Sequence, residues 1–206
     1  MSSAIGQDDR ELVEGFWKDY VDGYIMRDLY YCIHAGANYL VALGEMCYVE
    51  FLGKLMTGKE SPTDNFMTFV RGYLPRYDPK TDPTFLGKLY GEVRSGLVHS
   101  YFPENVNVIA REKASHGPPS IWQEKDGRWM ISVADFMTEF KGAADALKAD
   151  LLAGKYLKEF KIAVSENPGL ERISRWPVGG ASMASTTTTT YMSGGVIYPP
   201  PKSLEE

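Results

Sequence analysis

The stretch from Asp28 to about Met56 constrains the fold more than any other part of this sequence. Apolar residues occupy nearly the whole circumference when the stretch is drawn as a helix. Small residues along it let neighbouring helices approach closely: Ala35, Gly36, Ala37, Ala42 and Gly44. A helix that is apolar all round has to be buried. The stretch therefore predicts one long central helix around which the other helices of a bundle pack.

Shorter amphipathic segments surround this stretch, and their apolar residues recur at steps of three and four, which is typical of helices with one buried face. The expected helices cover residues 8–26, 64–74, 83–101, 133–152 and 155–164. Short β-type runs lie at 106–110, 121–124 and 129–133, and Asp126-Gly127 between the last two favours a type I′ hairpin turn. The expected fold class is mainly α, a helical bundle with a small antiparallel β-hairpin insert at about 106–133.

The composition changes near residue 177. Residues 186–190 are five consecutive threonines, and residues 199–201 are three consecutive prolines. Such a segment buries too little apolar surface to offset the entropy of ordering it. We therefore expect one domain over residues 8–170 and a disordered or loosely attached tail over residues 177–206. Four apolar side chains in the tail are exceptions that could dock on the body of the protein or on a partner: Tyr191, Val196, Ile197 and Tyr198.

The charge distribution argues against a general attraction to nucleic acid or anionic lipid. The net charge is −5 and the isoelectric point is near 5.3. Residues 1–50 hold nine acids and three bases, whereas residues 51–105 hold six acids and seven bases. A bound anion would therefore be held by a local patch, and the middle third of the chain is the expected place for it.

Nothing in the sequence indicates export, a membrane span or a metal centre. The uncharged run Leu29–Gly44 is shorter than the roughly 18–20 residues that a membrane span needs. Cys32 and Cys47 would lie about 22 Å apart along the expected central helix, too far apart to pair. The three histidines and two cysteines show no metal-ligand spacing. We expect a cytoplasmic protein that uses no metal and no cofactor.

The expected helix at 83–101 carries a cation, an imidazole and a phenol within two turns. Its apolar stripe comprises Phe85, Leu86, Leu89, Tyr90, Val93, Leu97 and Tyr101. Arg94 and His99 flank the stripe and are expected on the opposite face, whereas Tyr101 belongs to the stripe and is also a candidate core residue. Small or cationic residues share that opposite face: Lys88, Gly91 and Ser95. Such a face can admit a second helix or a phosphodiester close to the backbone.

The spacing Arg94-x4-His99-x-Tyr101 resembles the motif of the HEPN superfamily, in the version found in HEPN toxins that pair with minimal nucleotidyltransferases. The resemblance implies an all-helical domain that acts as a metal-independent endoribonuclease in a toxin–antitoxin or antiviral system. It implies that His99 is the general base and Arg94 the phosphate ligand, with Ser95 and Lys88 as substrate-binding residues and Tyr101 as a candidate modification site. It also implies a homodimer, an RNA substrate and an antitoxin partner.

Two other interpretations remain open. Ser95 stands where active members usually carry Asn, Asp or His, which favours a catalytically silent relative that binds a nucleotide or a partner protein. The third interpretation is a structural helical assembly protein. In that case Arg94 would form a salt bridge with Glu50 or Glu92, and His99 would only stabilise the carboxyl end of its helix.

Overall fold

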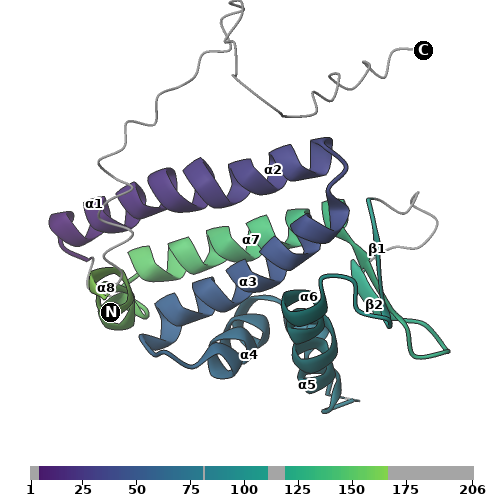
Figure 1. Cartoon of the computed structure of the whole chain (residues 1–206). Coiled ribbons are helices and arrows are strands. Elements are labelled where there is room, and N and C mark those ends of the chain that lie inside the picture. The colour runs from purple at the N-terminus through teal and green to yellow at the C-terminus, as the bar shows by residue number, and fades with distance from the viewer. Residues whose placement is uncertain (1–4, 81, 111–118, 167–206) are drawn as a thin grey trace, which may run out of the picture.

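A computed structural model describes residues 5–80, 82–110 and 119–166 (Figure 1). The fold is mainly helical, as expected, with a small three-stranded sheet at one end. The tail expected at 177–206 lies outside the described residues. Among the helices of the described ranges, none has the length and apolar character needed to cross a membrane.

The chain begins with one continuous helical rod. α1 (Gln7–Phe16) passes without a break into the π-helical segment η1 (Trp17–Met26) and then into α2 (Arg27–His34). The helix expected at 8–26 is therefore present, and it continues to His34. A π-helical segment has a wider turn than an α-helix, so side chains beyond it are rotated from the positions that an ideal α-helical pattern predicts.

The expected single helix from Asp28 to Met56 is wrong, because the chain reverses at Gly36. Gly36 has φ +72°, and the amide of Ala37 donates to the carbonyl of Cys32 at 2.9 Å. This is the six-to-one hydrogen bond of a Schellman helix ending. After the turn, α3 (Asn38–Thr57) runs back along the rod. The all-round apolar pattern does not indicate where the chain reverses. Of the small residues expected to allow close packing, Ala35, Gly36 and Ala37 form the turn, whereas Ala42 and Gly44 lie within α3.

The reversal places α2 beside α3. A Cβ added to Gly44 of α3 would lie 3.2 Å from a methyl carbon of Leu29 on α2. Cys32 and Cys47 therefore lie on two different helices of this pair and not along one helix, and both are free thiols.

α3 is the central helix of the bundle, as the all-round apolar pattern predicted. α4 (Pro62–Tyr73), α7 (Val133–Leu152) and α8 (Leu157–Ser165) all pack on it. The buried apolar residues of α3 are Val41, Ala42, Met46, Val49, Leu52, Leu55 and Met56. A short 3-10 turn, η2 (Pro75–Tyr77), follows α4.

The helix that carries the motif is also present, with a π-helical middle. It consists of α5 (Phe85–Lys88), η3 (Leu89–Arg94) and α6 (Ser95–Ser100). Its buried residues are Leu86, Leu89, Val93 and Leu97, which are members of the expected stripe. It starts two residues later than expected and ends at Ser100.

The sheet differs in part from the expected hairpin. β2 (Ile121–Gln123) and β3 (Trp129–Ser132) pair antiparallel, as expected, but β1 (Val106–Ile109) pairs parallel with β3, so the sheet is mixed with order β1-β3-β2. The turn is not type I′, because Gly127 has φ +88° whereas Asp126 has a negative φ. The short β-type segments in the sequence predicted the strands. They did not predict that β3 would be the central strand of the sheet.

The sheet is anchored on the motif helix through Trp129. The Trp129 side chain is fully buried, with its ring 5.1 Å from that of Phe85. Its indole Nε1 donates to the Glu92 carboxylate at 2.7 Å. The sheet thereby holds one side of the motif helix while α3 holds another.

Gly53 should be the least replaceable glycine of the helix core. A Cβ at Gly53 of α3 would lie 1.9 Å from the carbonyl oxygen of Asn65 on α4, so Gly53→Ala has to push the two backbones apart. We expect a loss of about 3 kcal/mol in the free energy of unfolding, at the upper end of overpacking effects. Chemical denaturation of both proteins measures it.

The matched control is Gly142→Ala on α7, where a Cβ would meet nothing within 4 Å. This change should stabilise the protein by about 0.5–1 kcal/mol, because alanine loses less backbone entropy than glycine in a helix. Similar effects of the two substitutions would contradict the close α3–α4 contact.

Candidate functional site

Arg94 lies between the motif helix and α3, and not on an open face. Its guanidinium forms an ion pair with the Glu50 carboxylate of α3, and its side chain is only 16% exposed. The guanidinium carbon also lies 5.4 Å from the centre of the Tyr90 ring, where a cation is attracted by the ring face. The expectation that Arg94 points away from the apolar stripe is therefore wrong, and its contact with Glu50 is the one expected of a structural role.

The ion pair with Glu50 does not satisfy all of the N–H groups of the Arg94 guanidinium. The Nε of Arg94 is buried and has no hydrogen-bond partner within the described ranges. Burial raises the pKa of the Cys47 thiol, which also feels the charges of Arg94 and Glu50. Glu92, the other carboxylate considered for Arg94, accepts the indole N–H of Trp129 instead.

His99 lies at the exposed end of α6, apart from Arg94. Its side chain is exposed, and it has no hydrogen-bond partner in residues 5–80, 82–110 and 119–166. Five α-helical steps separate Arg94 from His99, which is a rotation of about 140° around the helix axis. One chain therefore does not bring the two side chains to a single point.

The remaining residues of the expected face are accessible to different degrees. Lys88 is exposed and Ser95 is half-buried. A Cβ added to Gly87 or Gly91 would meet nothing within 4 Å, so this side of the helix is open. The expected surface of small and cationic residues is present at Lys88, Gly91 and Ser95. It lacks Arg94, whose side chain packs against α3 instead.

Tyr101 is not a core residue, contrary to one of the two expectations for it. It follows the last residue of α6 with φ +58°, which rotates its side chain out of the stripe, and it is 39% exposed. Its ring centre lies 4.6 Å from that of Phe102 and 6.1 Å from that of Tyr39 on α3. A modifying group could reach Tyr101 without unfolding.

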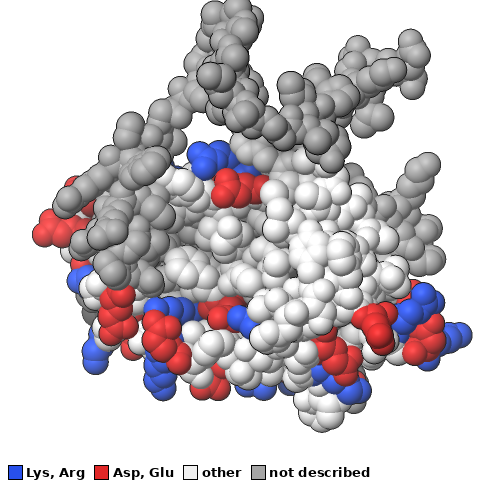
Figure 2. Space-filling model, in the orientation of Figure 1, with Lys and Arg blue, Asp and Glu red and all other residues white. Residues whose placement is uncertain are grey.

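An exposed aromatic surface beside His99 was not predicted. We call it the turn-end face, because it lies where the α2–α3 turn meets the end of α6. Its centre is half-buried Tyr39 with exposed Tyr101 and Phe102, and exposed Leu40 and Val98 belong to the same two segments. Two runs without any Asp, Glu, Lys or Arg build it, residues 29–44 and 95–103. Figure 2 shows a broad uncharged area over this part of the molecule. The two runs were a usable signal, but only the fold shows that they meet.

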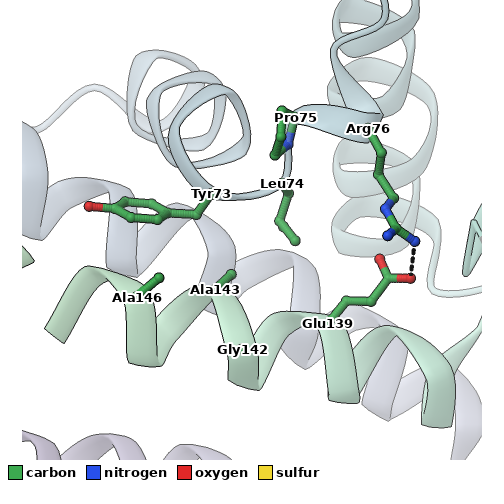
Figure 3. A pocket seen from close by; sticks show the side chains of 8 residues that line it. All are labelled: Tyr73, Leu74, Pro75, Arg76, Glu139, Gly142, Ala143 and Ala146. Atoms are coloured by element: carbon green, nitrogen blue, oxygen red, sulfur yellow. Dashed lines mark hydrogen bonds and ion pairs between the residues drawn. The ribbon is translucent and has the colours of Figure 1, made fainter. Parts of the chain in front are cut away.

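A groove of about 410 Å³ lies between the end of α4 and α7 (Figure 3). The carboxylate of Glu139 at its edge accepts hydrogen bonds from Arg76 at 2.8 Å, from the Ser120 hydroxyl at 2.5 Å and from the Tyr77 hydroxyl at 2.6 Å. Burial, reinforced by the bond to Glu139, raises the pKa of Tyr77. Since both carboxylate oxygens are occupied, this cluster ties α7 to η2 and the sheet and offers no free acid or base.

Glu45 is the most unusual ionisable residue of the core. Its side chain is fully buried on α3, and neither carboxylate oxygen has a hydrogen-bond partner in the described part of the chain. Burial raises the pKa of Glu45 well above its ordinary value. No group of three or more metal-ligating side chains gathers there or elsewhere among the described residues.

Comparisons with known proteins add no relative. A scan against protein-family models, a search of curated proteins and a search of solved structures each find no match to this chain. The function has to be inferred from the residues and their geometry.

Glu45 should make the protein less stable at neutral pH than at acidic pH. Below an unfolded pKa of about 4.3 both states keep the proton. As the pH rises, the unfolded chain ionises while the folded protein keeps Glu45 protonated, so stability falls until the folded pKa is reached. Glu45→Gln, which cannot ionise, should therefore raise the melting temperature relative to wild type more at pH 7 than at pH 4. Exposed Glu104 supplies the control Glu104→Gln. An equal effect of Glu45→Gln at both pH values would contradict a buried, protonated Glu45.

Arg94 and Glu50 should be coupled in stability. Arg94→Ala leaves a carboxylate that is only 19% exposed without its cation, so we expect a loss of about 1–3 kcal/mol. The double variant with Glu50→Ala should lose clearly less than the sum of the two single variants. His99→Ala, on the exposed side of the same helix, should change the free energy of unfolding by no more than about 0.5 kcal/mol. Additive losses in denaturant unfolding would show that the two side chains do not interact.

Proposed function

We propose that this chain cleaves RNA as a HEPN-like, metal-independent endoribonuclease whose working site is shared by two copies. The observation that carries the proposal is the state of His99, which is exposed and without a partner in the described ranges, on a helix with an open glycine side. A general base has to be accessible and able to take up a proton near neutral pH, and an imidazole meets both conditions.

The reaction needs one base and one cation. His99 takes the proton from a ribose 2′-hydroxyl, and the 2′-oxygen attacks the adjacent phosphorus. As the new O–P bond forms, the bond to the 5′-oxygen breaks. That oxygen takes a proton from water, and the protonated His99 then returns its proton to the solvent. The products are a 2′,3′-cyclic phosphate and a 5′-hydroxyl. Arg94 would hold the phosphate through its guanidinium N–H groups and stabilise the charge that develops on it.

Two copies are proposed because one chain separates the two groups. Arg94 leans onto α3, whereas His99 lies on the exposed side of the helix. If two motif helices met across a two-fold axis, Arg94 of one copy could approach His99 of the other. The open side at Gly91 would let the helices come close, and Lys88 and Ser95 would add donors for the RNA backbone.

The same proposal makes Tyr101 the site at which modification would regulate the activity. Tyr101 is exposed and lies two residues after His99, so a group attached to its hydroxyl would crowd the base. A nucleotide-transferring antitoxin partner would silence the enzyme at this position.

The purified protein should cleave total RNA in the presence of EDTA. His99→Ala should reduce the rate about 10²–10⁴-fold, the usual contribution of a general base. Arg94→Lys should also lose most of the cleavage activity, because an ammonium group cannot make the paired hydrogen bonds of a planar guanidinium. Gel analysis of RNA fragments and detection of cyclic phosphate ends measure the reaction. Equal cleavage by wild type and His99→Ala would assign the activity to a contaminant.

Mixing the two inactive variants tests the shared site. When Arg94→Lys and His99→Ala chains exchange, a mixed dimer pairs the intact Arg94 of one with the intact His99 of the other. Half of the dimers then hold one good site of two, so about a quarter of the wild-type activity should return. A mixture as inactive as its components, although mixed dimers form, would place each site within one chain.

A second candidate function is a catalytically silent relative that binds a partner protein. The ion pair between Arg94 and Glu50 favours it, since a guanidinium held by an internal carboxylate has less to offer a phosphate. The exposed aromatic residues of the turn-end face are suited to protein binding. This candidate is preferred if wild-type protein leaves RNA intact while Arg94→Ala still lowers the stability.

A further inference from the structure

The turn-end face exposes several large apolar and aromatic side chains to solvent. Its large side chains are from 39% to 65% exposed, with Tyr101 at the lower limit and Phe102 at the upper limit. The ring of half-buried Tyr39 lies 4.7 Å from that of Phe102 and joins the residues of α3 to those that follow α6. A cluster of large exposed aromatic and aliphatic side chains often marks a site that a ligand or partner covers.

The side chains of this face favour an apolar, uncharged ligand. Tyrosine and phenylalanine rings offer flat apolar walls, and tyrosine hydroxyls at the rim offer hydrogen bonds to backbone carbonyls. Because residues 29–44 and 95–103 contain no Asp, Glu, Lys or Arg, a strongly charged segment would lose its hydration there with few charged side chains to pair with. Exposed aromatic side chains are typical binding surfaces for proline-containing segments, whose extended conformation costs little entropy to fix.

The chain itself contains such a segment. Residues 176–201 carry no Asp, Glu, Lys or Arg, the longest uncharged run in the sequence. Near its end the order is Val196-Ile197-Tyr198-Pro199-Pro200-Pro201, two aliphatic residues and an aromatic ring followed directly by three prolines. The sequence thus places apolar side chains directly before consecutive prolines, a composition that favours an extended segment able to bind aromatic side chains.

The connecting chain is long enough to reach the face. α8 ends at Ser165 and packs beside the carboxyl end of α3, where the backbone of Glu159 lies 3.3 Å from a Cβ built on Gly58. The turn-end face lies at the opposite end of α3, about 30 Å away for a helix of 20 residues. Residues 167–195 can span up to about 95 Å, and a coil of that length averages about 30 Å from end to end. A tether whose average length matches the distance raises the local concentration of its segment most effectively.

We propose that Val196–Pro201 dock on the turn-end face of the same chain, with Tyr198 and the prolines against Tyr39, Tyr101 and Phe102. The docked segment lies next to His99 and so also restricts the approach of a second molecule to this end of α6. The proposal depends on the aromatic face alone, and it holds whether or not the protein cleaves RNA.

Site-specific photo-crosslinking in the full-length protein tests the docking. A benzoylphenylalanine probe replaces Tyr198, and a control probe replaces Thr188 within the threonine run. Mass spectrometry then locates the crosslinked residues. The probe at position 198 should react with peptides covering 29–44 and 95–103, and the probe at position 188 should not. A mixture of heavy-isotope and ordinary protein shows whether the partners belong to one chain.

A substitution on the face completes the test. Phe102→Ser should lower the crosslinking yield from position 198 about tenfold or more, because an aromatic anchor is lost. The control Leu12→Ser on α1 removes an apolar side chain that is 39% exposed but lies outside the face, and it should leave the yield unchanged. Unchanged helical circular dichroism and melting temperature confirm that both variants fold.

Three results would overturn the proposal. The probe at position 198 could react no more specifically than the probe at position 188. Its crosslinks could persist in Phe102→Ser. Or they could join heavy and light chains only, which would mean that a second copy supplies the segment.

Discussion

The burial of α3 on nearly all sides is the constraint on which the rest of the structure depends. Helices from both halves of the chain pack around it, and at Gly53 the backbone of α4 comes so close that no side chain fits between them. An apolar surface of this extent can be removed from water only by a complete shell of neighbours. The reversal at Gly36 supplies one side of that shell and the return of α7 and α8 supplies another. Within this shell Glu45 is fully buried and has no hydrogen-bond partner among the described residues, and this burial raises the pKa of its carboxyl group.

The motif helix is held by two contacts that give its residues different environments. Glu50 of α3 draws Arg94 inward, and Trp129 of β3 binds Glu92 on another side. His99 lies beyond both contacts, at the end of α6, where its side chain is exposed and has no partner among the described residues. The two motif residues therefore lie in different surroundings, with the cation held against α3 and the imidazole exposed. Chemistry that needs both groups at one phosphate requires either a second copy or a rearrangement of Arg94.

Charge is distributed unevenly over the molecule, and this gives the turn-end face its character. Lys, Arg, Asp and Glu decorate much of the surface in Figure 2, whereas the end formed by the α2–α3 turn and α6 is uncharged. Exposed aromatic side chains in such an area are unfavourable in water. An apolar ligand that covers them would therefore gain binding free energy from the removal of this surface from water. Since Tyr101 belongs to this area and His99 lies two residues before it, a ligand bound there would restrict access to both side chains.

The sequence by itself determined the helical class, the central role of the apolar stretch, the motif helix and the β2–β3 hairpin, because local periodicity and turn residues report which backbone conformation a segment prefers. It could not reveal the reversal at Gly36, since a segment that is apolar all round looks the same whether it continues or folds back. Nor could it show that β1 joins β3 in parallel. At the candidate site, spacing predicted which residues share a helix, but the direction of Arg94 and the exposure of Tyr101 were decided by Glu50 and by the positive φ after α6. Those features depend on contacts between residues distant in sequence, which only the tertiary structure brings together.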